Sequence, residues 1–277
     1  MISGWSWSPL IHEAFDRYRD IISPIKSSFF GFVTFKEADN LPLLALHIRR
    51  GDYSEHCRGM AGWGSSYTGQ NSFPEFEERD KFIVPQVIEG HSSSNLGSTT
   101  QPGDALIVSS QDERLKYYMK HCYPDIGQVV ERVRQVVHDY ELFARDRSKS
   151  GSQRKYENWG GLKTWQKKSW SAAGRQKSVG NKLLKRIYIM SNGDRHFLQE
   201  LKQALMDDAE RSKLSGDGET TNDWEFEWTW EGVSTSRDLK LGWEEKPVGQ
   251  ALDMYIGQKS ELFIGNGVRN CYFFFSF

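Results

Sequence analysis

Short, mostly apolar runs alternate with amphipathic stretches along this chain, and this alternation constrains the fold more than any other feature. The runs Leu43–Ile48, Ile187–Met190 and Glu261–Ile264 have the length of buried strands. Apolar residues at helical spacing predict helices at Pro9–Ile22, Ile126–Phe143, Phe197–Leu205 and Val248–Ile256. The pattern predicts an α/β fold, a Rossmann-like parallel sheet with crossover helices.

The first strand runs out into a cluster of polar residues, His47, Arg49, Arg50 and Asp52, around Gly51. Open α/β sheets bind ligands at the carboxyl ends of their strands. Arginine suits a diphosphate there, because its planar guanidinium donates two parallel hydrogen bonds and stays charged. Two other interpretations remain open: an Arg–Asp pair that only caps the strand, and an adhesion tripeptide at residues 50–52.

A second candidate phosphate-binding segment, Gly265-Asn266-Gly267, follows the last strand. Small residues let backbone N–H groups approach a phosphate, although an ordinary turn has the same composition. Asp253 lies within an apolar helix face, where a carboxylate needs a partner. It either holds a ribose or a base edge, or accepts hydrogen bonds from backbone N–H groups.

Composition excludes several classes of protein. The 277 residues carry a net charge of −1 and three cysteines, with no zinc-ligand spacing and no run long enough to span a membrane. We therefore expect no metal. The glycine-rich stretch Ser54–Glu89 is interpreted as a long loop. Residues 145–182, basic and tryptophan-containing, are interpreted as a flexible insertion, since no RNA-binding signature accompanies them, and residues 269–277 as an atypical aromatic tail.

Several motifs together resemble one enzyme family. The segment His47–Asp52 resembles the H-x-R-R-x-D motif of GDP-fucose-dependent fucosyltransferases. Further stretches look similar in the same order: Cys122–Pro124, Ile187–Asp194, Thr235–Leu239, Gln250–Gly257 and Phe263–Asn266. The set looks most like the fungal O-fucosyltransferase-like proteins.

The resemblance implies the C-terminal, donor-binding half of a GT-B glycosyltransferase. By this analogy the enzyme transfers fucose from GDP-fucose to a hydroxyl of a protein or glycan acceptor, with inversion and without a metal. Arg49 is the implied catalytic residue, contacting the diphosphate, and the nucleotide would be bordered by His47, Arg50, Asp52, Asp253, Gly265, Asn266 and Gly267. The analogy also implies a disulfide between Cys57 and Cys122 and work in the ER or Golgi lumen, although no signal peptide or anchor is visible in the chain.

The chain departs from the family pattern at both ends. It has no Gly-Gly-x-Asn-Asn loop, and after Asn266 it lacks the Ser-Ser donor loop. We therefore expect a truncated chain with residues 1–42 as a remnant of the first half, and residues 43–144 with 183–268 as the nucleotide-sugar-binding domain. The alternatives are an inactive or vestigial nucleotide-binding fragment and a nucleic-acid-binding accessory protein.

Overall fold

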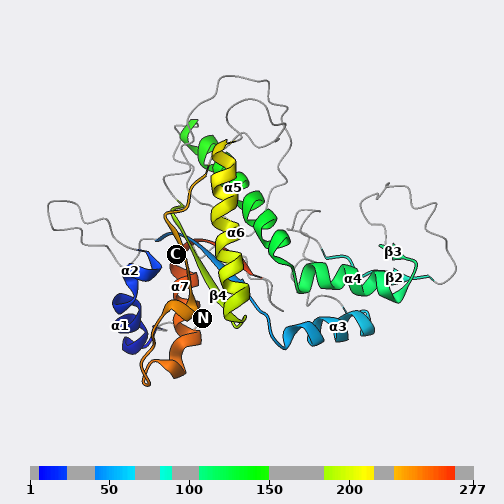
Figure 1. Cartoon of the computed structure of the whole chain (residues 1–277), viewed down its shortest axis with the longest axis horizontal. Helices are drawn as coiled ribbons and strands as arrows, with labels where there is room; N and C mark the ends of the chain where they lie inside the picture. The colour runs from blue at the N-terminus through cyan, green and yellow to red at the C-terminus, as the bar shows by residue number, and fades with distance from the viewer. Residues whose placement is uncertain are drawn as a thin grey trace.

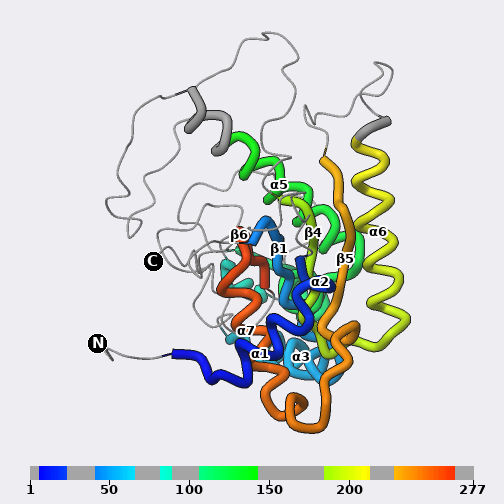
Figure 2. Tube along the Cα trace, turned by 90° about the vertical axis from the view of Figure 1, so that its left-hand side faces the viewer, coloured from blue at the N-terminus to red at the C-terminus, as the bar shows by residue number. Residues whose placement is uncertain are grey.

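A fully parallel, four-stranded sheet forms the centre of the computed structural model, which describes residues 6–23, 41–65, 82–88, 106–149, 184–214 and 228–265. The order across the sheet is β5-β4-β1-β6, and Figure 2 shows the four strands side by side. Their bounds are Leu41–Ile48 (β1), Arg186–Ser191 (β4), Gly232–Thr235 (β5) and Ser260–Gly265 (β6). The predicted α/β class with a parallel sheet is confirmed, and the arrangement is consistent with a Rossmann-like fold.

Both faces of the sheet are buried, as parallel sheets require. In β1, Leu44, Leu46 and Ile48 belong to one apolar cluster. Leu43 and Ala45 belong to the cluster on the opposite face. The alternation follows from the two-residue period of a strand, and it explains why the run reads as continuously apolar.

Each face is covered by helices predicted from helical spacing (Figure 1). On one face lie α5 (Ile126–Lys149) and α6 (Arg195–Leu214). On the other lie α1 (Pro9–Arg17), α2 (Arg19–Ile22) and α7 (Gly249–Lys259). Because α1 and α2 pack on the same sheet as α7, the segment before β1 contributes to this core.

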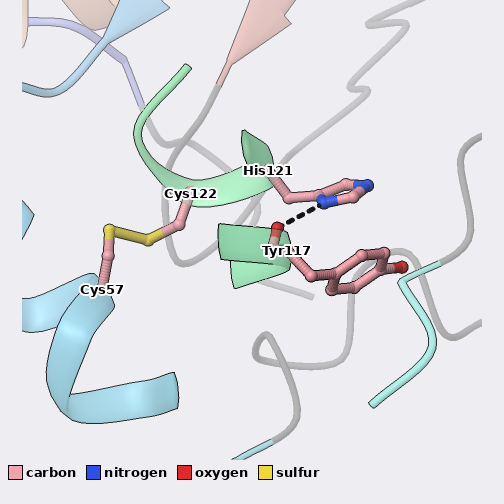
Figure 3. Close-up of a disulfide and its surroundings, with 4 residues drawn as sticks. All are labelled: Cys57, Tyr117, His121 and Cys122. Atoms are coloured by element: carbon pink, nitrogen blue, oxygen red, sulfur yellow. Dashed lines mark hydrogen bonds between the residues drawn. A yellow bond between two sulfur atoms is a disulfide. The ribbon is translucent and has the colours of Figure 1, made fainter. Parts of the chain in front are cut away.

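A third apolar cluster lies beyond the sheet, where α3 (Tyr53–Trp63) packs against α4 (Gln111–Cys122). A short parallel pair, β2 (Gln86–Val87) and β3 (Ile107–Val108), lies beside α4. The disulfide between Cys57 and Cys122 joins the two helices across 65 residues of sequence (Figure 3). The pairing implied by the family resemblance is confirmed.

Three sequence-based boundaries differ from the bounds of the observed elements. Residues 54–63 of the expected long loop belong to helix α3, because Tyr53, Cys57, Met60 and Ala61 form one buried helical stripe. The expected insertion begins inside α5, which continues to Lys149, and the expected domain boundary at residue 42 falls inside β1. The rest of the insertion and the aromatic tail lie outside the described residues.

The strand order defines a topological switch point. From β1 the chain proceeds to β4 and β5 with α5 and α6 on one face, and then α7 crosses the opposite face to place β6 on the other side of β1. The chain therefore adds β4 and β5 on one side of β1 and adds β6 on the other side. In open α/β sheets the ligand crevice lies at such a reversal, outside the carboxyl ends of the strands. Here that position lies between β1 and β6.

Candidate functional site at the carboxyl edge of the sheet

Arg49 is the more exposed of the two arginines that follow β1. Its side chain is 49% exposed, and Nη2 lies 3.6 Å from Oδ2 of Asp52, which is itself 76% exposed. The guanidinium also lies over the ring of Tyr53, 5.1 Å from the centroid. A loose surface ion pair of this kind contributes little to stability, so Arg49 can exchange Asp52 for another anion at small cost.

Arg50 has a different environment from its neighbour. Its guanidinium lies between the rings of Tyr123 and Phe197, with centroids at 4.2 and 3.9 Å. Burial lowers the pKa of Arg50, while Tyr123, Asp125 and Asp194 act in the opposite direction. Nη1 is buried and has no hydrogen-bond partner among the residues that the structure describes. Arg50 thus links the end of β1 to the end of α4 and the beginning of α6.

The loop after β1 is held by the loop after β4. Asn192 accepts a hydrogen bond from the backbone N–H of Arg50 at 2.6 Å and donates to the carbonyl of the same residue at 3.1 Å. Gly51 follows in the left-handed region, at φ 64°. A Cβ there would lie 3.4 Å from Nδ2 of Asn192, so glycine meets both the backbone and the space requirements.

The end of β5 supports the β4 loop in turn. Arg237 donates from Nε to the carbonyl of Gly193 at 2.9 Å and from Nη2 to that of Asn192 at 3.4 Å. Asp238 accepts from Lys202 at 2.7 Å and from the backbone of Thr235 at 2.7 Å. Burial alone would raise the pKa of Asp238, but these hydrogen bonds outweigh it and lower the pKa.

Asp194 caps the N-terminus of α6. Its Oδ1 accepts from the backbone N–H of Phe197 at 2.8 Å, and this bond is the main cause that lowers the pKa of Asp194. A cap of this kind fixes where α6 begins. It thereby places Phe197 beside Arg50.

His47 and Gly265 face each other across the switch point, since they are paired in the register of β1 and β6. His47 is partly buried, and burial together with the charge of Arg49 lowers its pKa. A Cβ at Gly265 would lie 3.7 Å from Cβ of His47 and 3.1 Å from the ring of Phe263. A residue without a side chain therefore keeps this position open beside the histidine.

Asp253 on α7 has a partner within the protein. Its Oδ1 accepts a hydrogen bond of 2.7 Å from the hydroxyl of Tyr188 in β4. Burial raises the pKa of Asp253 to about 6, and the Tyr188 bond lowers it. Tyr188 is paired with Ala45, two residues before His47, so Asp253 lies below the edge of the sheet.

The predicted site residues are thus partly brought together. His47, Arg49, Arg50, Asp52 and Gly265 share the carboxyl edge, and Asp253 joins them through Tyr188. Asn266 and Gly267 lie outside the described residues. Sequence reasoning did not assign site roles to Asn192, Arg237, Tyr123 and Phe197, although polar residues after neighbouring strands are a signal for the first two.

Within the described residues, no group of three or more His, Cys, Asp or Glu side chains is arranged to hold a metal ion. None of the described helices is long and apolar enough to cross a bilayer. No protein-family model, curated protein or solved structure matches the chain.

Proposed function

We propose that this chain is the donor-binding half of a GT-B fucosyltransferase that uses GDP-fucose. One observation carries the proposal: Arg49, half-exposed and 3.6 Å from Asp52, lies at the carboxyl edge beside the switch point between β1 and β6. A diphosphate at this edge would meet a guanidinium that can leave Asp52 at little cost. The resemblance of the motifs described above, H-x-R-R-x-D first among them, supports GDP-fucose as the donor.

In the proposed reaction an acceptor hydroxyl oxygen forms a bond to the anomeric carbon of fucose. The bond from that carbon to the β-phosphate oxygen breaks, GDP departs with the electron pair, and the configuration inverts. The hydroxyl proton passes to a base on the acceptor side. Negative charge grows on the departing β-phosphate, so a guanidinium held there stabilises the transition state more than the ground state.

Calorimetric titration with GDP, GMP and GDP-fucose tests this function. We expect GDP to bind more tightly than GMP, because the second phosphate reaches Arg49. Loss of a charged hydrogen bond costs about 1.5–3 kcal/mol, so Arg49→Ala is expected to weaken GDP binding roughly 10- to 100-fold. Arg58→Ala is the matched control, since Arg58 is exposed on α3 and pairs with Glu55 at 3.6 Å.

Equal GDP affinity in Arg49→Ala and the unmodified protein would refute the proposal. The vestigial alternative predicts GDP binding without turnover, so release of GDP from GDP-fucose in the presence of acceptor separates the two. A nucleic-acid-binding role rests on the basic segment at residues 145–182. Unchanged RNA and DNA retention after deletion of residues 150–182 would exclude that role.

A further inference from the structure

We propose that Asn192 and Arg237 are positioning residues that set the geometry of Arg49. The inference rests on the proposed function, because it concerns how the diphosphate-binding arginine is held. Neither residue is assigned a role in binding the donor. Both act through the backbone of the loop that carries Arg49 and Arg50.

The side chain of Asn192 continues the hydrogen bonding between β1 and β4 beyond their last main-chain pair. The last register pair between β1 and β4 is Ile48 with Ser191. One residue farther along β4, the Asn192 amide makes two reciprocal hydrogen bonds with the backbone of Arg50. A side-chain amide carries both a donor and an acceptor, so it satisfies N–H and C=O of one residue as a neighbouring strand would. These two hydrogen bonds, called the Asn192 clasp below, fix the backbone immediately after Arg49.

Arg237 holds the backbone of the loop that carries Asn192. Its Nε and Nη2 donate to the carbonyls of Gly193 and Asn192. The backbone of the β4 loop is therefore held by Arg237, in the turn directly after β5, and the backbone of the β1 loop is held by Asn192. Three neighbouring parallel strands are linked at one edge, and the linkage ends beside Arg49, whose side chain is half exposed.

The linkage matters because the backbone that it holds carries Arg49. Its ion pair with Asp52 is long and its side chain is half exposed. A shift of this backbone would therefore move the guanidinium of Arg49 relative to the diphosphate. A site held by supporting contacts keeps its geometry before the ligand arrives, which lowers the entropy lost on binding.

A double-mutant cycle on GDP affinity tests the inference. Asn192→Ala is expected to weaken GDP binding roughly tenfold in the unmodified background, and to have no further effect in the Arg49→Ala background. Arg237→Ala is expected to weaken binding by a smaller factor, with partial rescue in Arg237→Lys. Gln203→Ala is the control, because Gln203 is exposed and pairs only with Asp207 on its own helix in the described contacts.

Backbone hydrogen exchange without ligand gives a second readout. The amide of Arg50 is expected to exchange slowly in the unmodified protein and at least tenfold faster in Asn192→Ala, while the melting temperature changes little. Fast exchange in the unmodified protein, or unchanged exchange in the variant, would overturn the inference even if GDP does not bind. An equal loss of affinity in both backgrounds would also overturn it, because Asn192 would then act independently of Arg49. Absence of GDP binding together with the expected exchange pattern would refute the proposed function alone.

Discussion

The hydroxyl of Tyr188 in β4 donates a hydrogen bond of 2.7 Å to Oδ1 of Asp253 on α7. The bond joins an interior strand of the sheet to the helix that crosses behind the switch point. It also gives a buried carboxyl one defined partner. The stability of the fold is therefore expected to depend on the ionisation of Asp253.

Asp253→Asn is expected to remove part of the pH dependence of stability. Burial raises the pKa of Asp253 from 3.8 to about 6, so the folded state keeps its proton where the unfolded state has lost it. This stabilising contribution is present below about pH 4 and is lost as pH rises through about 6. The difference in unfolding free energy between the two proteins is expected to change by roughly 1–3 kcal/mol between pH 4 and 7.5, measured by urea unfolding.

Tyr188→Phe provides the matching control for this effect. It removes the hydrogen bond that lowers the pKa of Asp253. The pH at which stability is lost should then move upward. Identical slopes in the unmodified protein, Asp253→Asn and Tyr188→Phe would contradict the assignment.

His47 is expected to have the opposite pH dependence. Burial, and then the charge of Arg49, lowers its pKa from 6.5. The folded state releases this proton first, so the stabilising contribution is present above about pH 6.5 and is lost as pH falls below it. An NMR titration of the imidazole should give a midpoint below 6.5. Arg49→Ala should raise that midpoint and Arg58→Ala should leave it in place.

Removing the disulfide is expected to destabilise the protein by about 2–4 kcal/mol, since a cross-link over 65 residues restricts the unfolded chain. The double variant Cys57→Ser/Cys122→Ser should melt at a lower temperature than the oxidised protein. Reductant should lower the melting temperature of the unmodified protein to a similar value and should not change that of the double variant. An unmodified protein insensitive to reductant would argue against the bond.

Glu245→Gln is expected to cost about 1.5–3 kcal/mol, the range for hydrogen bonds to a charged group. The buried carboxylate of Glu245 accepts from Arg17 at 2.5 Å, from the Tyr18 hydroxyl at 3.2 Å and from the backbone of Gly242 at 2.9 Å. These contacts join α1 to the loop before α7. Thermal unfolding measures the loss, and the exposed neighbour Glu244, changed to Gln, should show almost none.

The parallel sheet could be predicted because β1 and β4 are buried on both faces and contain mostly apolar residues. Helix α3 could not, because its glycines indicate a loop while its packing does not require them. A Cβ at Gly62 would meet nothing within 4 Å, and one at Gly59 only the Trp63 ring at 3.9 Å. The stripe that buries α3 depends on α4 and on a disulfide to a residue 65 positions away.

Part of the candidate site could also be predicted from the sequence, and part could not. The place of Arg49 at the carboxyl end of a strand could be predicted, because the apolar run directly before it indicates that strand. The Asn192 clasp joins residues 142 positions apart and exists only because β1 lies beside β4. Nor does the local sequence distinguish the two arginines. The rings of Tyr123 and Phe197 do so, and both come from other elements.

The direction of α5 has a practical consequence. The helix begins close to Tyr123, next to Arg50, and continues to Lys149, after which the described chain resumes at Leu184. Lys185 donates to the carbonyl of Pro42 at the start of β1, so the chain re-enters where the strands begin. Leu184 and Lys185 therefore lie at the opposite end of the sheet from Arg49. A surface-coupling tag inserted directly before Leu184 would be attached away from the arginine edge, which leaves that edge accessible from solution.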